Sequence, residues 1–268
     1  MWMRQRLEEI WANSLLRLLP ARRYESYHPQ RQVSYLGKTL IFNTPSGSSH
    51  WRVDHFLDAE PETLRWLTRL APGDVMYDVG ANVGMYSIVA AKVHGARVFA
   101  FEPEGQNYAT LYKNIAWNRC ADAITAYCIA VMDDLKVDYL NLAQFTVASA
   151  MHAFGKNLRQ PGTDGATELE SFEPDFRQGA ISFAIDDLIA RGLPKPRFMK
   201  IDVDGFEPLV IEGARNLLMT TDRLSVLVEV NPNVSTHRDM LAWMKSLGYR
   251  TDDWSGVGNS ANFIFDRE

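Results

Sequence analysis

After residue 72, the pattern of apolar and polar positions alternates between that of a strand and that of a helix along most of the chain. The segment 75–80 is largely apolar and strand-like, and residues 85–94 then follow a helical period. The same patterns recur further on, and they predict strands at 97–101, 124–131, 198–203 and 225–230 and helices at 106–118, 207–219 and 238–247. Strand and helix patterns that alternate in this way indicate βαβ units. We therefore expect an α/β fold whose mostly parallel sheet carries helices on both faces.

The last residues of the chain depart from this alternation. Two strand-like segments, 249–254 and 262–266, flank a Ser-Gly-Val-Gly-Asn stretch that favours a turn. They predict a C-terminal antiparallel hairpin at the edge of the mostly parallel sheet. Dinucleotide-binding folds usually end on a parallel strand, so the hairpin favours another class of α/β protein.

Two regions without the regular alternation suggest how the chain is divided. Residues 1–70 are expected to form an N-terminal cap, with a helix, a β segment at 33–42 and a second helix at 61–70, and residues 71–268 the main domain. Within that domain, residues 143–180 are rich in Gly, Pro, Ser and acidic residues and have little periodicity. Because a long irregular loop in a compact domain is usually functional or disordered, we expect an insertion on the substrate side.

Composition narrows the range of partners and locations. A net charge of −5 and a pI near 5.7 disfavour nucleic acid as a partner, because phosphate binding needs a clustered basic excess. Cys120 and Cys128 are too few for a disulfide framework. No secretion signal and no membrane-spanning apolar run is found, so we expect a cytoplasmic protein. An amphipathic stripe over residues 7–18 predicts a helix packed on the domain, with peripheral membrane contact as the alternative.

The segment 77–87, Tyr-Asp-Val-Gly-Ala-Asn-Val-Gly-Met-Tyr-Ser, leads from a strand through a glycine turn into a helix. Glycines allow a sharp turn and a close approach to a ligand, while the free amides of a helix N-terminus favour an anion. The dinucleotide fingerprint has a middle glycine so that the backbone can contact a pyrophosphate, but here that position is Asn82. A side chain there suits a ligand without phosphate, such as the methionine end of S-adenosylmethionine.

The next strand ends in Phe-Glu-Pro, which places an acid at its carboxyl end. Glu102 at this position is able to accept hydrogen bonds from both ribose hydroxyls of an adenosine, and Pro103 ends the strand. A Gly-x-x-x-Gly turn alone is a weak signal. Together with Asp78 and the flanking elements, Glu102 indicates a nucleoside cofactor.

Charged and apolar residues alternate in the strand predicted at 198–203. Lys200, Asp202 and Asp204 therefore lie on one side of the segment. Charges in a central strand that is buried on both faces are costly unless they are paired or functional. A structural Lys200–Asp202 ion pair is one interpretation. The other is a functional role for Asp202, which lies nearer the carboxyl end of the strand, where open α/β sheets bind ligands.

These motifs resemble those of the FkbM family of methyltransferases. The most specific match is the Lys-Ile-Asp-Val-Asp-Gly-Phe-Glu-Pro-Leu-Val-Ile-Glu-Gly-Ala run at 200–214, where many relatives carry Glu in place of Asp204. The resemblance implies a Rossmann-like seven-stranded methyltransferase fold, S-adenosyl-L-methionine as methyl donor, and O-methylation of a sugar, glycan or small natural product. The residues expected at the cofactor are Asp78, Gly80, Ala81, Asn82, Gly84, Tyr86, Ser87, Glu102, Pro103 and Ala130.

The resemblance and the strand ends together suggest which residues act on the acceptor. Asp202 is the first candidate, with Lys200 beside it and Glu229 at the end of the next strand. Asp202, Glu229 and Asn231 are oxygen-bearing side chains of the kind that hold Mg²⁺. Acids at strand ends equally cap helices or hold water, and we expect this second role rather than a metal.

Other residues remain open alternatives. His152, in the irregular segment, and His237, after the Asn-Pro-Asn turn at 231–233, are candidate general bases, although exposed loop histidines are usually inert. Trp51, His55 and Phe56 are expected either to cover the cofactor or to pack in the cap. A non-catalytic S-adenosylmethionine-binding protein and, with less support, a nicotinamide-dependent oxidoreductase are the alternative functions.

Overall fold

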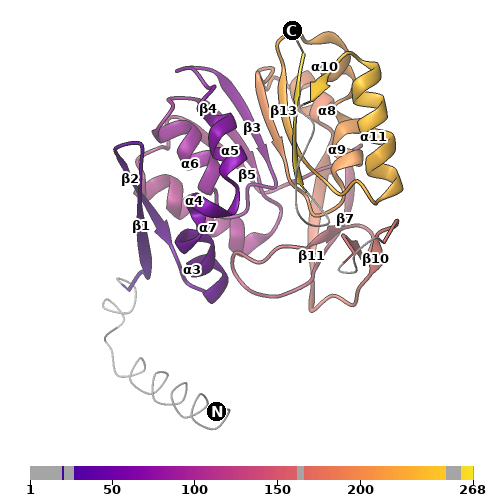
Figure 1. Cartoon of the computed structure of the whole chain (residues 1–268). Coiled ribbons are helices and arrows are strands. Elements are labelled where there is room, and N and C mark those ends of the chain that lie inside the picture. Colours follow the sequence, from indigo (N-terminus) through magenta and orange to yellow (C-terminus); the bar gives the residue numbers. More distant parts are fainter. Residues whose placement is uncertain (1–19, 21–26, 162–165, 252–260, 268) are drawn as a thin grey trace.

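The computed structural model describes residues 20, 27–161, 166–251 and 261–267. The main strands are β3 (Val75–Val79), β4 (Arg97–Phe101), β5 (Ile124–Tyr127), β12 (Phe198–Ile201), β13 (Ser225–Val230), β14 (Arg250–Thr251) and β15 (Ala261–Asp266). They form a seven-stranded sheet in the order β14-β15-β13-β12-β3-β4-β5 (Figure 1). β15 is antiparallel to both of its neighbours, whereas the other adjacent pairs are parallel. The predicted α/β fold with a C-terminal antiparallel pair is confirmed.

Helices cover both faces of this sheet (Figure 1). One face carries α4 (Phe56–Ala59), α5 (Pro61–Leu67), α6 (Met85–Lys92) and α7 (Gly105–Trp117), and the other carries α8 (Ile185–Ala190), α9 (Glu207–Gly213), α10 (Arg215–Thr220) and α11 (Ser235–Ser246). Successive strand residues point to opposite faces, so Met76 packs with the first group and Tyr77 with the second. Both faces are therefore buried, which explains the apolar runs in the central strands.

One helix predicted as continuous is interrupted. Residues 207–219 form α9 and α10, with Ala214 between them in a non-helical conformation (φ −107°, ψ 11°). The interruption lies where Gly213 packs so closely on the carbonyl of Met132 that a β-carbon would overlap it. Close packing on a neighbouring loop, which the local pattern does not encode, thus accompanies the break.

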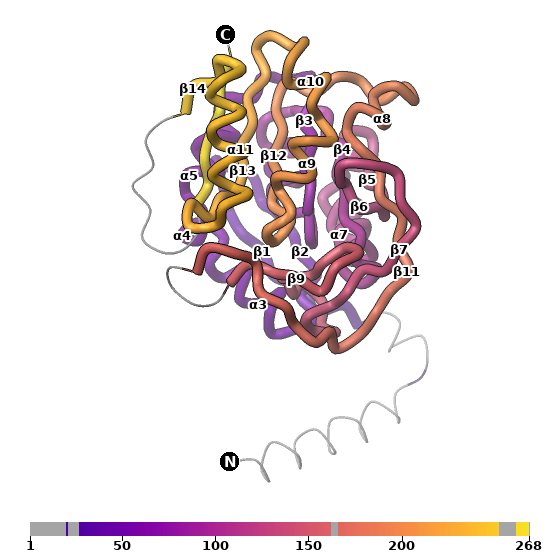
Figure 2. The backbone as a smooth tube through the Cα atoms, turned by 90° about the vertical axis from the view of Figure 1, so that its right-hand side faces the viewer, coloured from indigo at the N-terminus to yellow at the C-terminus, as the bar shows by residue number. Residues whose placement is uncertain are grey.

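A second, four-stranded sheet lies at the carboxyl end of the main strands (Figure 2). Its strands are β6 (Ala130–Val131), β7 (Lys136–Leu142), β8 (Ala153–Phe154) and β11 (Phe176–Phe183), and the short pair β9 (Leu158–Arg159) and β10 (Glu170–Ser171) lies beside it. One expectation is corrected here: the strand predicted at 124–131 divides between the two sheets as β5 and β6. Most described residues of the segment expected to be irregular, 143–180, lie outside strands, and the exceptions are β8, β9, β10 and the start of β11.

The residues before β3 share their core with the main domain. β1 (Gln30–Tyr35) and β2 (Lys38–Asn43) form a hairpin, followed by α3 (Gly47–Asp54). Leu40 and Phe42 pack in the same core as Ile88 of α6. α7 also binds the edge of β2, since Asn114 Oδ1 accepts from the Asn43 amide at 2.7 Å. The helix expected near the N-terminus lies outside the described residues.

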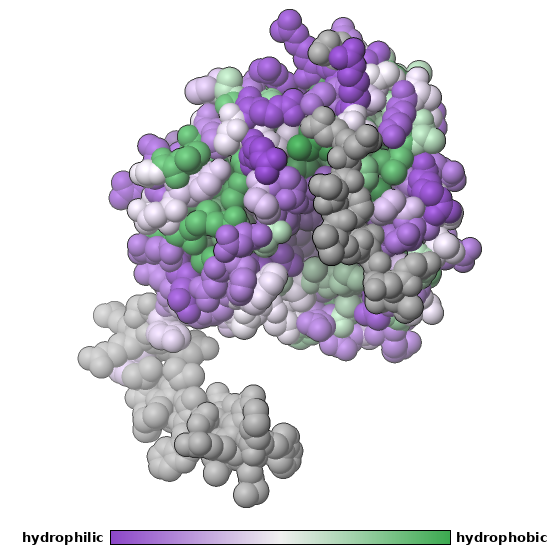
Figure 3. Space-filling view, viewed as in Figure 1, coloured by the Kyte–Doolittle hydropathy of each residue, from purple (hydrophilic) through white to green (hydrophobic). Residues whose placement is uncertain are grey.

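One face of the molecule is mostly polar in its described part. On the face seen in Figure 3 hydrophilic residues predominate and hydrophobic ones gather in separate small patches. Among the described helices, none has the length and apolar character needed to cross a bilayer.

Candidate active site

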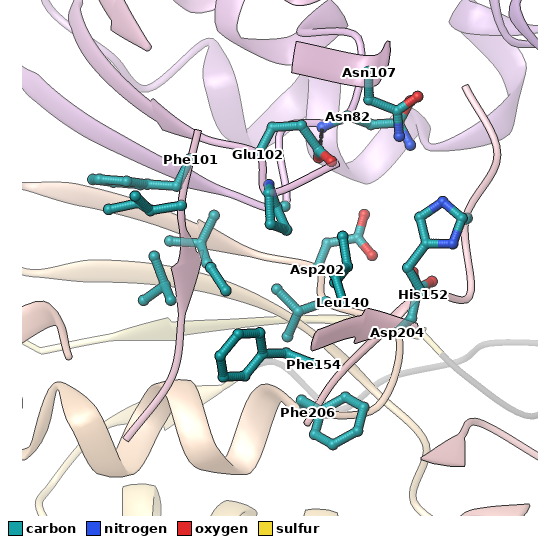
Figure 4. Close-up of a pocket in the computed structure, with 18 of the residues that line it drawn as sticks. Asn82, Phe101, Glu102, Asn107, Leu140, His152, Phe154, Asp202, Asp204 and Phe206 are labelled. Carbon is teal, nitrogen blue, oxygen red and sulfur yellow. Dashed lines mark hydrogen bonds between the residues drawn. The ribbon is translucent and has the colours of Figure 1, made fainter. Parts of the chain in front are cut away.

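Two connected hollows lie where the main strands end. The first, here called the Glu102 cavity, has a volume of about 100 Å³ and is open at one side. Apolar side chains from both sheets line it together with several polar ones, the polar residues being Arg52, Asn82, Glu102, Asn107, Ser149, His152, Asp202 and Asp204. Figure 4 shows Glu102 and Asn82 on one side, Asp202 near the middle, and Phe154 and Phe206 opposite. A flat apolar group with polar edges would suit such walls.

The second hollow, the Lys200 cavity, has a volume of about 260 Å³. Its lining comes from the cap and the glycine turn and includes Trp51, Arg52, Phe56, Glu60, Asp78, Ala81, Tyr86, Lys200 and Asp202. Arg52, Gly80, Asn82 and Asp202 line both cavities. One ligand is therefore able to extend from one cavity into the other across the glycine turn.

Glu102 is fixed at the end of β4 by two backbone amides. Its Oε2 accepts from the Asn82 amide at 2.8 Å and its Oε1 from the Glu104 amide at 2.9 Å. Burial, with the charges of Glu104 and Asp204 nearby, raises the pKa of Glu102 to about 7, although the two amide hydrogen bonds act in the opposite direction. Each carboxylate oxygen keeps a second lone pair, so Glu102 remains able to accept hydrogen bonds from two ligand hydroxyls.

Asn82 joins the glycine turn to the segment that precedes β8. Its backbone is left-handed (φ 50°), a conformation that Asn tolerates, and its Nδ2 donates to the carbonyl of Ser149 at 2.8 Å. The glycines beside it serve packing: a β-carbon on Gly80 would overlap the carbonyl oxygen of Asp202, and one on Gly84 would overlap Leu111. The turn is thus shaped by its contacts with neighbouring segments of the protein.

Asp78 is buried at the end of β3 beneath the Lys200 cavity. The hydroxyl of Ser87 donates to its Oδ2 at 2.5 Å, while its Oδ1 has no hydrogen-bond partner among the described residues. Burial raises the pKa of Asp78, and the nearby Lys200 ammonium opposes the rise. A buried carboxylate oxygen without a partner is costly unless a ligand or water donates to it.

Lys200 and Asp202 form the ion pair that the alternation of charges suggested. Lys200 Nζ lies 2.6 Å from Asp202 Oδ2, with the lysine side chain only 2% exposed and the aspartate 30% exposed. Burial opposes ionisation of Asp202, but the Lys200 charge outweighs it and lowers the pKa of Asp202. Asp202 is therefore a carboxylate that faces both cavities and holds protons weakly.

Asp204 also borders the Glu102 cavity but carries no ion pair within the described chain. Its backbone is left-handed (φ 58°), and its Oδ2 accepts from the Met151 amide at 2.6 Å. Burial and the neighbouring charge of Asp202 raise the pKa of Asp204 to about 7. Of the two aspartates, Asp204 has the greater affinity for a proton.

Three carboxylates converge behind these residues, but they are not the three expected from the sequence. Ligand atoms of Asp202, Glu207 and Glu229 lie within 4.8 Å of one another. Asn231 instead caps its own turn, since its Oδ1 accepts from the Asn233 amide. Glu207 is largely engaged as well, because its Oε1 accepts from the amides of Val203 and Gly205. With the Lys200 ammonium already paired to Asp202, the set fits a divalent cation poorly.

Neither candidate histidine is placed as a free base. His237 is fully buried, its Nδ1 accepts from the Asn231 amide and its Nε2 donates to the Gly205 carbonyl at 3.3 Å. His152 lines the Glu102 cavity, but its Nδ1 accepts from the Ala143 amide. Burial, with Arg52 nearby, lowers the pKa of His152 to about 4. Both therefore act as structural hydrogen-bonding groups.

Most residues expected at the cofactor do meet at these cavities. Those that line one or both are Asp78, Gly80, Ala81, Asn82, Tyr86, Glu102, Pro103 and Ala130. Gly84 and Ser87 lie behind the lining, Gly84 against Leu111 and Ser87 on Asp78. Trp51 and Phe56 border the Lys200 cavity, while His55 stacks on Trp51 at 4.8 Å between ring centroids.

The sequence did not indicate some of the residues that line the Glu102 cavity. Arg52 comes from α3, and Asn107 comes from the first turn of α7. Their chemistry is common on helix surfaces, and only tertiary contacts bring them to the cavity. Asp204 stood within a recognised motif, but only the structure shows that it lines the Glu102 cavity without an ion pair in the described part of the chain.

Comparison with known proteins shows to which family the chain belongs. A family model described as "Methyltransferase FkbM domain" matches residues 78–251. The chain belongs to the FkbM methyltransferase family. This FkbM protein is 30% identical over 201 residues to the 31-O-demethyl-FK506 methyltransferase FkbM of Streptomyces tacrolimicus, covering 69% of this chain and 76% of that protein. It is 27% identical over 200 residues to the hexuronic acid methyltransferase AglP of Haloferax volcanii, covering 74% and 73%.

The family assignment establishes a methyltransferase and confirms the resemblance seen in the motifs. Among solved structures, the precorrin-6Y C5,15-methyltransferase of Geobacter metallireducens matches 77% of this chain and 85% of its own, with 14% identity and a TM-score of 0.45. A likeness of this size says nothing about function.

Proposed function

We propose that this FkbM methyltransferase uses S-adenosyl-L-methionine to methylate a hydroxyl oxygen of a sugar, glycan or small natural product. The names of the two relatives, one for a demethylated natural product and one for a hexuronic acid, support this range of acceptors. The observation that carries the proposal is Glu102, a carboxylate held rigidly at the end of β4 beside an apolar-walled cavity.

The Glu102 cavity suits the nucleoside part of the cofactor. Glu102 would accept from the ribose hydroxyls, and apolar residues such as Phe101, Ile129 and Val131 would pack on the adenine. The Lys200 cavity suits the methionine part. There the unpartnered Oδ1 of Asp78 would accept from its ammonium group, a match that a nicotinamide dinucleotide does not offer.

The bound cofactor supplies a methyl group on a positively charged sulfur. Asp202, kept ionised by Lys200, borders both cavities and provides negative charge where the two parts of that ligand would join. The acceptor hydroxyl has to lose its proton as its oxygen gains the methyl group. Asp204 borders the same cavity and has no ion pair in the described part of the chain, and we assign the proton to its carboxylate. Glu229 stands behind Asp202 and helps to orient it.

Binding of the product S-adenosylhomocysteine tests the cofactor assignment directly. At one hundred times its dissociation constant it should stabilise the protein by about 2.7 kcal/mol, which is a clear rise in Tm, and NAD at the same concentration should have no effect. Glu102→Gln is the matched variant, expected to fold and to show a smaller rise. A rise with NAD and none with S-adenosylhomocysteine would contradict the proposal.

A further inference from the structure

A third hollow opens beside the two cofactor cavities, between α3 and the segment that leads to β8. This Trp51 groove has a volume of about 490 Å³ and is lined by Gly47, Ser48, Trp51, Arg52, Ala143, Gln144, Ala148, Ser149, Ala150, Met151 and Arg159. Arg52, Ser149 and Ala150 also line the Glu102 cavity. A ligand in the groove would therefore lie beside the Glu102 cavity.

The walls of the groove are tied together by hydrogen bonds on both sides. Ser46 and Arg52 of the α3 region donate to the carbonyls of Val147 and Ala148 at 2.6 and 2.9 Å. From the cofactor side, Asn107 Oδ1 accepts from the Ala148 amide at 2.6 Å. These bonds hold the segment between α3 and the glycine turn, so the groove is formed before a ligand enters.

The charge of the groove is opposite to that of the cofactor cavities. Its lining residues include two arginines and no acid among the residues that the structure describes, although the whole chain has a net charge of −5. Arg159 is paired with Glu170 at 3.0 Å. Arg52 has no ion pair in the described part of the chain, and its Nε–H bond to Ala148 orients the guanidinium while leaving the two terminal nitrogens available. A planar carboxylate matches that fork.

The groove also presents a flat apolar surface. Trp51 remains 56% exposed while it lines the groove, and its ring is held by stacking on His55. The apolar C–H face of a sugar ring packs well on such an aromatic surface, while its hydroxyls remain available to Gln144 and to backbone groups. Aromatic side chains provide contact area with little loss of conformational entropy.

We propose that the Trp51 groove binds the methyl acceptor, and that this acceptor is a sugar carrying a carboxylate, with Trp51 packing on the ring and Arg52 binding the carboxylate. This inference rests on the proposed transfer to a sugar hydroxyl. Both Trp51 and Arg52 lie before the segment 78–251 that matches the family model, while the opposite wall of the groove lies within it.

Binding of two glycosides to the protein saturated with S-adenosylhomocysteine tests the inference without requiring turnover. The probes are methyl β-D-glucuronide and its neutral counterpart methyl β-D-glucoside, followed by ligand-observed NMR. We expect the glucuronide to bind at least tenfold more tightly. Arg52→Gln should remove this preference, Gln144→Glu should also reduce it by placing a like charge in the groove, and Trp51→Ala should weaken both glycosides. Arg191→Gln, which makes the same charge change on α8 outside the groove, is the control.

Several results would overturn the inference. They are equal affinity for the two glycosides, no binding of either, a preference that survives both Arg52→Gln and Gln144→Glu, or tighter binding of glucose 6-phosphate than of the glucuronide. A loss of S-adenosylhomocysteine affinity in Arg52→Gln, with 5′-methylthioadenosine affinity retained, would assign Arg52 to the cofactor carboxylate instead. Failure of the wild-type protein to bind S-adenosylhomocysteine would contradict the proposed function itself and is measured separately by calorimetry.

Discussion

The cofactor cavities and the Trp51 groove share Arg52 but differ in origin and in charge. The cavities form at the ends of β3, β4 and β12. There Asp78 is held by a hydroxyl, Glu102 by backbone amides and Asp202 by a lysine. The groove forms between a cap helix and a segment before β8, and arginine provides its charge. Parallel strands bring their ends together in any protein of this fold, whereas the groove depends on tertiary contacts between α3 and the segment before β8.

This difference explains how one family would serve many acceptors. The groups that we assign to the cofactor stand at the ends of strands, and the groups that we assign to the acceptor stand on a helix and a loop, which tolerate insertion and exchange more readily. If the two cavities bind the cofactor and the Trp51 groove binds the acceptor, changes at the strand ends should affect turnover and cofactor binding for every acceptor. A change in the groove at a residue that lines neither cavity, such as Gln144, should affect acceptor choice alone.

The largest effect is expected for the proton acceptor. Asp204→Asn retains the shape of the side chain but removes its basicity, so turnover should fall by about 10²-fold or more. S-Adenosylhomocysteine affinity should change little. Turnover and affinity measured on one preparation separate the two effects. Asp202→Asn is the comparison variant, and a larger loss of turnover there with Asp204→Asn nearly normal would return the role of base to Asp202.

A smaller effect is expected at the ribose-binding acid. Glu102→Gln replaces charge-assisted hydrogen bonds, which contribute about 1.5–3 kcal/mol each, so S-adenosylhomocysteine affinity should fall at least tenfold. Calorimetry measures the loss, and circular dichroism checks that the variant folds. Unchanged affinity in a folded variant would remove Glu102 from the site.

The pH dependence of cofactor binding gives a finer test of the same residue. Because burial raises the pKa of Glu102 to about 7, the free protein carries a neutral carboxyl group below that pH. The ligand requires the ionised form as acceptor, so affinity should be nearly constant above pH 8 and fall towards tenfold per unit well below pH 7. Glu102→Gln should flatten this profile. Asp204→Asn, which removes a neighbouring charge, should shift the fall to lower pH, and a profile unaffected by either variant would contradict the assignment.

The main sheet was predictable because each of its central strands can be recognised from its own short stretch of sequence. Strands β3, β4, β12 and β13 are short apolar runs between turns, and a buried parallel sheet requires such runs. The carboxylates at their ends followed from the direction of the strands. The glycine turn was recognised as well, but the contacts that Gly80 and Gly84 avoid with Asp202 and Leu111 are tertiary and were not visible in the sequence.

The second sheet was not predictable in the same way. β11 contains Gly179 and has several exposed positions, so its sequence has no strong strand pattern. Its conformation depends on pairing with β7, and that partner lies far away along the chain. Arg52 illustrates the same limit for the site. An arginine on an amphipathic helix predicts only exposure, and the contact with Ala148 that orients it joins two distant segments.

Removal of divalent cations is expected to have the smallest effect on turnover. Asp202, Glu207 and Glu229 have ligand atoms within 4.8 Å of one another, a spacing that would bind Mg²⁺ if the carboxylates were uncompensated. Two of them are partly compensated: the Lys200 ammonium lies 2.6 Å from Asp202, and two backbone amides donate to Glu207 Oε1, whereas Glu207 Oε2 has no hydrogen-bond partner among the described residues. A second positive charge at that place would be repelled by Lys200.

Turnover should therefore change by less than about twofold between EDTA and added Mg²⁺, within the scatter typical of near-neutral changes. Loss of activity in EDTA that Mg²⁺ restores, and that Glu229→Gln reproduces, would instead make these three acids a metal centre and Lys200 its regulator.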